Sequence, residues 1–306
     1  MISKQKIGLY IFLILDAVLV VLCFLQVFHP IFGLEDFGLF NAKGPVAAAQ
    51  ARLIVTAFLL MLIIVIPVLT AGFFVAFKYR VGRNEDYDPE WGQKHGYLKF
   101  FMWAFPVLII IFISILNFKS AHSLDPAQAI SAGSPPLTIQ VVALQWKWLF
   151  IYPGQNIATV NYIDIPQNVP LHFELTADAP MSLFWIPQLG GEMAAMQGMV
   201  TGINLMATQT GTFTGQNSEI NGEGYARMKF TVNSTSRANF DAWVAGVKKN
   251  SPMLNEEEYN KLIPPSQNNA PAYYGSVDAN LYNNVVMKFT APSSAAASSV
   301  PAMYMK

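Results

Sequence analysis

The chain has 306 residues, a formal net charge of zero, and a composition that is 53% hydrophobic but only 12% charged. Soluble domains carry about 25% charged residues, so this composition favours a membrane protein over an ordinary soluble domain. The neutral balance gives no reason to expect nucleic acid as a partner. A single cysteine, Cys23, excludes an internal disulfide framework.

The first apolar run, Ile7–Phe28, follows two lysines, as a signal peptide or a signal anchor does. Its length favours an uncleaved anchor, although Asp16 in the middle of a membrane span is costly. Residues 1–28 are therefore predicted to be either a signal peptide or an anchor helix. Lipidation of Cys23 is the weaker possibility, because Leu22 is a poor residue before a lipidated cysteine.

Two further apolar runs, Leu53–Phe77 and Phe100–Phe118, predict a transmembrane helical hairpin over residues 52–118. A helix over the first run is about 37 Å long, enough to cross a hydrocarbon core of about 30 Å with some tilt. The alternative is a pair of buried core helices. Residues 29–51 are predicted to form a periplasmic segment ahead of the hairpin.

Basic residues set the predicted orientation of the hairpin, because positive charge is retained on the cytoplasmic side. The connection between the two spans and its flanks is rich in them, whereas His29–Gln50 contains only Lys43. The basic residues of the connection are Lys78, Arg80, Arg83, Lys94 and Lys99. The chain is therefore predicted to be a multi-pass membrane protein, with everything after Lys119 outside the bilayer on the side opposite the cytoplasm.

After the hairpin, the pattern of the sequence changes several times. Residues 119–136 are rich in Ser, Ala and Pro and predict a linker. Residues 137–236 contain short segments of period two between Pro and Gly turns, which predict an antiparallel β-sandwich or barrel. Residues 237–290 predict a C-terminal helical extension. Residues 291–306 are low in complexity, which predicts disorder.

The stretch NSEINGEGYARM, residues 217–228, has the spacing of a copper-binding loop but lacks the usual ligands. Asn217, Asn221 and Tyr225 stand where cysteines and a histidine would complete such a loop, and the last histidine of the chain is His172. A mixed-valence copper pair needs soft thiolate bridges, and amides and phenols are hard, weak ligands. Met228 alone is more typical of a core side chain.

Several stretches resemble, in order and at family spacing, subunit II of the haem-copper respiratory oxidases. The resemblance covers about residues 50–290 and includes TAFLLMLIIVIP, FKYR, WAFPVLIIIF, QWKWLFIYP, ATVNYIDIP, SLFWIPQLGG and GYARMKF. It implies a membrane-anchored all-β protein, in which the hairpin is followed by a cupredoxin-like sandwich over residues 137–236 without copper. It also implies that the side opposite the cytoplasm is the periplasmic side of a bacterial inner membrane.

The resemblance also implies which residues occupy the positions of the copper ligands in cytochrome c oxidases. Asn217 and Asn221 match the two cysteines, Tyr225 matches one histidine, and Ser182 matches the earlier histidine. Glu219 and Met228 are retained. These losses are typical of the quinol oxidase branch, of the cytochrome bo type. We therefore expect no redox cofactor in this chain, with haems and copper in the partner subunit I.

The function that this resemblance implies is that of an accessory subunit of a proton-pumping quinol:oxygen oxidoreductase. The expected partners are subunits I and III, a small subunit IV, quinol as the substrate of the complex, and membrane lipid. One alternative is subunit II of a cytochrome c oxidase with unusual copper ligands. Another is a stand-alone, membrane-anchored cupredoxin-like protein used in binding or assembly.

Four further positions carry predictions. Trp146 and Trp148 lie two residues apart, which predicts an aromatic cluster on one strand face that packs at the membrane surface. Lys99 stands where family members commonly carry a glutamate at the mouth of a proton channel, so we expect protons to enter without a carboxylate from this subunit. His172 is expected on the solvent face of its strand.

Overall fold

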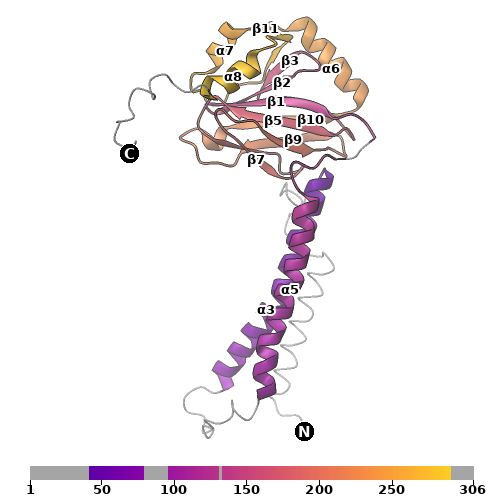
Figure 1. Cartoon of the computed structure of the whole chain (residues 1–306), viewed down its shortest axis with the longest axis vertical. Helices are drawn as coiled ribbons and strands as arrows, with labels where there is room; N and C mark the ends of the chain where they lie inside the picture. Colours follow the sequence, from indigo (N-terminus) through magenta and orange to yellow (C-terminus); the bar gives the residue numbers. More distant parts are fainter. Residues whose placement is uncertain (1–40, 79–95, 131–132, 291–306) are drawn as a thin grey trace, which may run out of the picture. The chain divides into compact units, whose positions relative to one another are not determined.

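The computed structural model describes residues 41–78, 96–130 and 133–290. This part of the chain divides into two compact units (Figure 1). One contains the helical residues 49–78 and 96–125, and the other contains residues 41–48 together with the chain from Pro126 onward. The predictions for residues 1–28, including Cys23, and for 291–306 lie outside the described residues.

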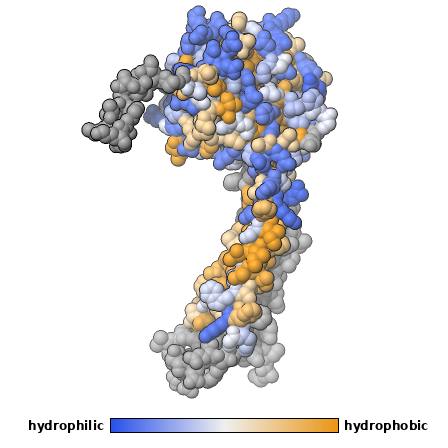
Figure 2. Space-filling view, viewed as in Figure 1, coloured by the Kyte–Doolittle hydropathy of each residue, from blue (hydrophilic) through white to orange (hydrophobic). Residues whose placement is uncertain are grey.

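Two long helices dominate the first unit. Helix α3 spans Pro45–Lys78 and helix α5 spans Gly96–Ser123. Both are long and apolar enough to cross a membrane. Large apolar side chains such as Phe58 and Trp103 are exposed on them, and Figure 2 shows apolar residues gathered along these helices. A hydrocarbon environment accounts for that exposure, and the predicted pair of apolar helices is confirmed.

Helix α3 begins before the expected start of the hairpin at residue 52. Pro45 is its first residue, and a proline suits that place because its fixed φ is helical and its missing N–H has no intrahelical partner there. The alanines at 47–49 then continue the helix, since alanine has the highest helix propensity. The expected periplasmic segment 29–51 therefore overlaps the helix, a shift that apolar run length alone could not reveal.

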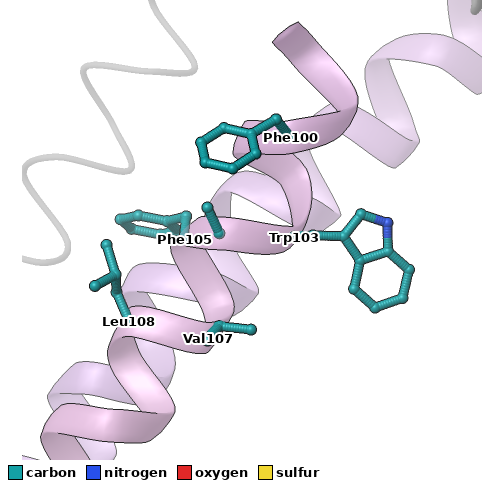
Figure 3. Close-up of a pocket in the computed structure, with 6 residues that line it drawn as sticks. Phe100, Trp103, Phe105, Val107 and Leu108 are labelled. Carbon is teal, nitrogen blue, oxygen red and sulfur yellow. The ribbon is translucent and has the colours of Figure 1, made fainter. Parts of the chain in front are cut away.

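Helix α5 carries an open apolar hollow near its beginning. It is lined by Phe100, Trp103, Ala104, Phe105, Val107 and Leu108. Figure 3 shows the Phe100, Phe105 and Leu108 side chains on one side of the helix and Trp103 on another. Such a surface suits contact with lipid or with another apolar helix.

The second unit is built on two β-sheets. The first has the strand order β12-β3-β2-β1-β5-β8, and the second has the order β4-β10-β9-β6-β7. Most pairs are antiparallel, but β1 pairs in parallel with β5, and β4 with β10. The strands are β1 (Leu137–Leu144), β2 (Lys147–Tyr152), β3 (Ile157–Val160), β4 (Tyr162–Pro166), β5 (Leu171–Ala177), β6 (Ser182–Trp185), β7 (Glu192–Ala195), β8 (Thr201–Leu205), β9 (Gly211–Asn217), β10 (Lys229–Thr235) and β12 (Ala272–Tyr274).

The core between the sheets is rich in aromatic rings. Phe184 and Phe230 stack with ring centroids 5.2 Å apart, and Trp148 packs edge-on against both. Alternation of buried and partly exposed residues along β1 and β5 matches the period-two pattern in the sequence. The predicted β-sandwich is confirmed.

Most of the C-terminal extension packs on the outer face of the first sheet, through residues such as Leu254, Tyr259 and Val285, whereas its first helix packs into the core between the sheets through Phe240. The extension contains helices as expected, α6 (Arg237–Asn250), α7 (Glu256–Leu262) and α8 (Leu281–Thr290). It also contains three short strands that the sequence did not predict, β11 (Met253–Leu254), β12 and β13 (Ser276–Val277). The aromatic β12 pairs with β3 and protects the edge of that sheet.

A buried acid holds the extension in place. The Asp178 side chain is only 2% exposed, and its carboxylate lies 2.7 Å and 3.0 Å from Nζ of Lys288 on α8. The Tyr259 hydroxyl on α7 donates a further hydrogen bond of 2.8 Å to the same carboxylate. Because two helices of the extension bind one acid at the end of β5, the extension is fastened to the sandwich at that point.

Candidate functional site

The candidate site is the loop between β9 and β10, with the beginning of β6 beside it. Asn217 ends β9, and Met228 immediately precedes β10. The backbone N–H of Asn217 donates to the carbonyl of Met228 over 3.0 Å, which closes the loop at its base. Strand β6 pairs with β9 and brings Ser182 next to the loop. Ser182 is far from this loop in the sequence, but the structure places it beside the loop, as the spacing of the copper-ligand positions predicted.

Asn217 is buried, and all of its amide group is engaged in hydrogen bonds. Its Oδ1 accepts from the backbone N–H of Leu183 at 2.9 Å and of Glu219 at 3.0 Å. Its Nδ2 donates to the carbonyl of Glu219 at 2.9 Å. One side chain thus joins β6 to the loop and fixes the backbone of Glu219, whose carbonyl is then already bound to protein.

Asn221 holds the other side of the loop. Its Nδ2 donates to the Ser182 hydroxyl at 2.8 Å and to the Met181 carbonyl at 3.2 Å. The Ser182 hydroxyl lies 3.9 Å from the Met228 sulfur, and Ser182 and Met228 are completely buried. Three of the predicted positions, Ser182, Asn221 and Met228, therefore form one polar cluster, in which Ser182 and Met228 are buried and Asn221 is partly buried.

Tyr225 contributes to the loop through its backbone. It begins a short 3-10 turn, η2 (Tyr225–Arg227), and its carbonyl accepts from the Met228 N–H at 3.1 Å. The six predicted positions together offer hydroxyl, amide, carboxylate, phenol and thioether groups. A dinuclear copper centre needs thiolate and imidazole donors, so this set does not fit such a centre.

Trp146 also belongs to the site, and its predicted placement on a strand face was wrong. It lies in the turn between β1 and β2 with a φ of +63°, a conformation that bulky residues rarely adopt. Its indole covers the loop glycines, because a Cβ on Gly224 would come within 2.4 Å of Trp146 Cδ2, and one on Gly222 within 3.2 Å of Cζ2.

Trp148 has a different position from Trp146. It lies on β2 with no exposed surface, inside the sandwich core, so it does not pack at the membrane surface as expected. The turn separates the two tryptophans, because the alternation of a strand applies only within the strand. Nothing in the spacing of two tryptophans signals this, although glycines at 222 and 224 indicate a close approach by another group.

A second polar cluster lies at the end of β10 opposite the loop. Asp164 on β4 is buried and accepts from Thr235 Oγ1 at 2.7 Å, Asn233 Nδ2 at 2.8 Å and the Tyr162 hydroxyl at 3.3 Å. Burial raises the pKa of the Asp164 carboxyl, and the three donors oppose that shift only in part. Burial, followed by the charge of Asp164, raises the pKa of Tyr162 to about 12.

Lys99 does not contribute to the loop site. It lies in the first turn of α5 and is exposed. Of the predicted site residues in the described part of the chain, the structure unites Ser182, Asn217, Glu219, Asn221, Tyr225 and Met228, and adds Trp146 to them.

Two family models match the outer part of the chain. "Cytochrome C oxidase subunit II, periplasmic domain" matches residues 154–235, and "COX Aromatic Rich Motif" matches residues 248–293. The first contains the candidate loop, and the second contains most of the extension described above. Together with the two apolar helices, these features define a membrane-anchored subunit II of the haem-copper oxidase class with a periplasmic domain.

Comparison with named relatives shows which family within this class the chain belongs to. The chain is 40% identical to the cytochrome bo(3) ubiquinol oxidase subunit 2 of Pseudomonas aeruginosa, over 83% of this chain and 77% of that protein. It is 38% identical to the ubiquinol oxidase subunit 2 of Acetobacter aceti, over 83% of each chain. The chain therefore belongs to the ubiquinol oxidase subunit 2 family, which confirms the resemblance seen in its sequence.

Solved structures are also similar to part of this chain. The periplasmic domain of subunit II of the cytochrome oxidase of Bradyrhizobium japonicum has a TM-score of 0.37 and 24% identity. The match covers 39% of this chain and 98% of that domain.

Proposed function

We propose that this chain is the metal-free subunit II of a quinol:oxygen oxidoreductase that pumps protons across the bacterial inner membrane. Haems and copper then reside in subunit I, with subunit III and a small subunit IV as further partners. In this complex the sandwich has a structural role. Electrons come from quinol, a lipid-soluble donor within the membrane, so no relay in the periplasmic domain is needed.

The observation that carries the proposal is the state of Asn217 and Asn221. They stand where a dinuclear copper centre requires bridging thiolates, and their amides instead hold the loop by hydrogen bonds to Leu183, Glu219 and Ser182. Protein groups thus supply the cross-links that metal bonds would otherwise make. The loop can keep its shape without metal, which explains why the spacing persists after the ligands are lost.

The test is an assay of the intact, purified complex with two electron donors, combined with metal analysis. We expect oxygen uptake with ubiquinol and none with reduced cytochrome c, and no copper beyond that bound by subunit I. Copper in the periplasmic domain with its near-infrared absorption band, together with activity on cytochrome c, would instead support a cytochrome c oxidase with unusual ligands. Purification of this chain without haem-bearing partners would support a stand-alone protein.

A further inference from the structure

Asn221 is followed by Gly222, and this is the only Asn-Gly pair in the sequence. An asparagine can lose its side-chain amide when the backbone nitrogen of the next residue attacks its Cγ. Glycine hinders this attack least, because it has no Cβ beside the attacking nitrogen. A reactive dipeptide therefore includes the residue that fastens the loop to β6.

The turn at Gly222 requires a glycine and is open to water. Gly222 is exposed and has a φ of +122°, a conformation that residues with a Cβ rarely adopt. A Cβ there would also lie 3.2 Å from Cζ2 of Trp146, which covers the loop. The backbone that shapes the turn thus also places the most permissive residue after Asn221.

Two hydrogen bonds hold the group that leaves in this reaction. Asn221 Nδ2 donates to the Ser182 hydroxyl at 2.8 Å and to the Met181 carbonyl at 3.2 Å, so both of its hydrogens are engaged. Because Nδ2 is lost as ammonia, both bonds must break during the reaction. The folded loop therefore slows the loss of the amide, and local opening of the loop permits it.

The carbonyl end of the same amide shows what the product would meet. Asn221 Oδ1 is buried, and no donor among the described residues reaches it. An aspartate carboxylate is charged and has no hydrogen to donate, so it would face the Met181 carbonyl with acceptor against acceptor. Burial of a charge that lacks donors is costly. The acid therefore cannot hold the loop as the amide does.

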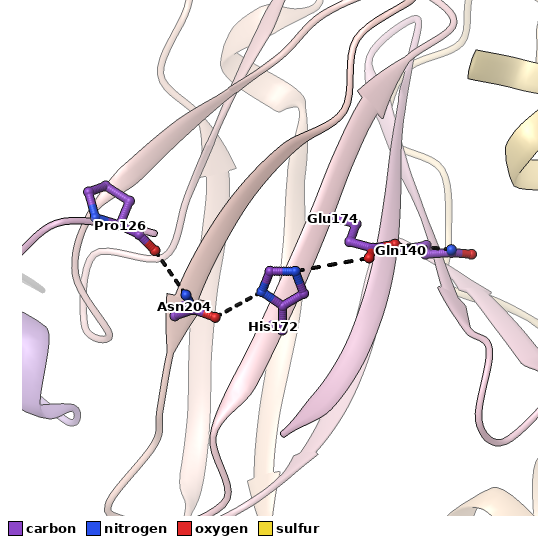
Figure 4. Close-up of polar contacts among 5 residues, drawn as sticks. All are labelled: Pro126, Gln140, His172, Glu174 and Asn204. Carbon is purple, nitrogen blue, oxygen red and sulfur yellow. Dashed lines mark hydrogen bonds and ion pairs between the residues drawn. The ribbon is translucent and has the colours of Figure 1, made fainter. Parts of the chain in front are cut away.

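Asn204 on β8 provides a contrast within the same sandwich. Its Nδ2 donates to the Pro126 carbonyl at 3.1 Å, and its Oδ1 lies 2.8 Å from Nδ1 of His172, which therefore carries the hydrogen. Figure 4 shows this amide bonded at both ends, with Glu174 beside the other nitrogen of the His172 ring. The next residue is Leu205, whose side chain hinders attack. Asn204 is therefore expected to keep its amide.

We propose that Asn221–Gly222 is a site of spontaneous deamidation, which the bonds to Ser182 and Met181 slow in the folded protein, and whose product loosens the loop from β6. The Gly222 nitrogen gives up its proton and bonds to Asn221 Cγ, the Cγ–Nδ2 bond breaks, and Nδ2 leaves as ammonia with that proton. Water then opens the resulting ring at either carbonyl, which gives aspartate or isoaspartate. The reaction needs no enzyme or oxidant, and it does not depend on which electron donor the complex uses.

The first measurement follows the amide in the purified complex during long incubation at mildly alkaline pH, beside a sample unfolded in urea. Chymotrypsin cleaves after Phe213 and Tyr225, so one peptide contains both Asn217 and Asn221, and its fragment masses show which of them has become an acid. We expect Asn221 to convert ahead of Asn217, and at least about tenfold more slowly in the folded complex than in urea. In the folded complex, Asn204 should remain an amide.

Ser182→Ala tests the protective bond, because it removes one acceptor of Nδ2 and leaves Asn221–Gly222 intact. Loss of one hydrogen bond of ordinary strength should make conversion of Asn221 about fivefold faster. The β1 and β2 amides must keep their protection from exchange, which separates this effect from general unfolding. If Ser182→Ala does not fold, the folded and urea-unfolded parent samples still decide whether the fold protects Asn221.

Asn221→Asp tests the effect of the product directly. The Ser218 N–H donates to the Leu183 carbonyl at 3.2 Å, between the loop and β6, and it should exchange about tenfold faster in Asn221→Asp and in the incubated parent. Asn283→Asp is the matched control, since Asn283 is exposed in the first turn of α8, and it should leave this exchange unchanged. No conversion of Asn221 in urea, equal rates in the two samples, or unchanged exchange in Asn221→Asp would overturn the proposal.

Discussion

The indole of Trp146 lies directly against Gly224, so closely that a Cβ on Gly224 would come within 2.4 Å of Cδ2. The backbone of Trp146 adopts a φ of +63° to reach this position. Such a conformation in a bulky residue costs of order 1–3 kcal/mol. The packing of the ring over the loop offsets that cost, so the pair forms a tight cover on the degenerate copper loop.

Replacement of Gly224 by alanine should therefore destabilise the periplasmic domain. Overpacking of a close contact typically costs about 1–3 kcal/mol. The measurement is thermal unfolding of the purified chain, followed by circular dichroism and by tryptophan fluorescence. Gly154→Ala is the control and should change the unfolding temperature little, because its Cβ would meet open space. Equal unfolding temperatures for the two variants would contradict the close packing of Trp146 on Gly224.

Asn217→Ala should have a larger effect than most substitutions in the loop. It leaves the N–H of Leu183 and both backbone groups of Glu219 without their partner. Unsatisfied buried groups cost about 1–3 kcal/mol each, and water can reach part of this loop, so a loss of about 2–4 kcal/mol is expected. Thr214→Ala, on the exposed side of the same strand, should cost less than about 1 kcal/mol.

The parent protein and Asn217→Ala also test whether the domain binds metal. If the loop depends on hydrogen bonds alone, added copper or a chelator should not alter the unfolding temperature of the parent or of Asn217→Ala. A parent protein that loses stability on chelation would show that a metal ion binds in the domain.

The location of the site could be predicted from sequence, because ligand spacing is a local property. The positions from Asn217 to Met228 lie within one loop, and family spacing added Ser182. What holds them together could not be predicted in this way. The contact of Asn221 with Ser182 depends on strand pairing between distant segments, and the cover by Trp146 depends on an unusual turn.

The fold could likewise be predicted where it depends on local sequence, and was missed where it depends on contacts between distant segments. Period-two alternation predicted the strands of the sandwich, and apolar length predicted both membrane helices. The start of α3 at Pro45 and the strand β12 within a mostly helical extension were missed. Both depend on contacts across the chain, of Ala47 with Leu189 and of β12 with β3, which override local pattern.

The raised pKa of Asp164 predicts a pH dependence of stability. Because the folded-state pKa lies above that of the unfolded chain, the folded protein binds the proton more tightly. Its contribution to stability is fully present below the unfolded pKa of about 3.9 and falls as the pH rises through the higher folded value. Asp164→Asn removes this titration, so its stability relative to the parent should improve as the pH rises over that interval.

The measurement for Asp164 is the unfolding temperature of parent and Asp164→Asn between about pH 4 and pH 8. The critical result is whether the unfolding temperature of Asp164→Asn rises relative to that of the parent as the pH increases. Its value at any single pH is less informative, since the amide also disturbs the contact with Asn233 at every pH. Asp278→Asn, at a partly buried turn, serves as a control for loss of one negative charge, because the amide oxygen can still accept from the Asn280 N–H. A constant difference between parent and Asp164→Asn across the whole range would contradict the raised pKa.

Lys288→Met should loosen helix α8 from the sandwich. The substitution leaves the buried Asp178 carboxylate with the Tyr259 hydroxyl but without its cation. Removing one partner of a fully buried pair costs about 3–5 kcal/mol, and the 47% exposure of Lys288 reduces the expected loss to about 1–3 kcal/mol.

A double-variant cycle tests the pair directly. Asp178→Asn combined with Lys288→Met should be more stable than the sum of the single losses predicts, because the neutral amide no longer needs a cation. Amide exchange over Leu281–Thr290 should rank the parent and the variants in the same order of stability. Strictly additive losses would show that Lys288 stabilises α8 independently of Asp178.

Lys99→Met tests whether Lys99 has a role in proton entry or only anchors helix α5 at the membrane surface. Lys99 lies exposed in the first turn of α5, where a long side chain can extend to the membrane surface and anchor the helix. Removal of its charge should therefore leave ubiquinol-driven oxygen uptake within about twofold of the parent, with an unchanged number of protons ejected per oxygen in proteoliposomes. Lys99→Arg is the matched control, because it retains the charge and the reach of the side chain. Loss of proton ejection in Lys99→Met with full recovery in Lys99→Arg would assign Lys99 a role in proton entry and contradict the interpretation that it only anchors the helix.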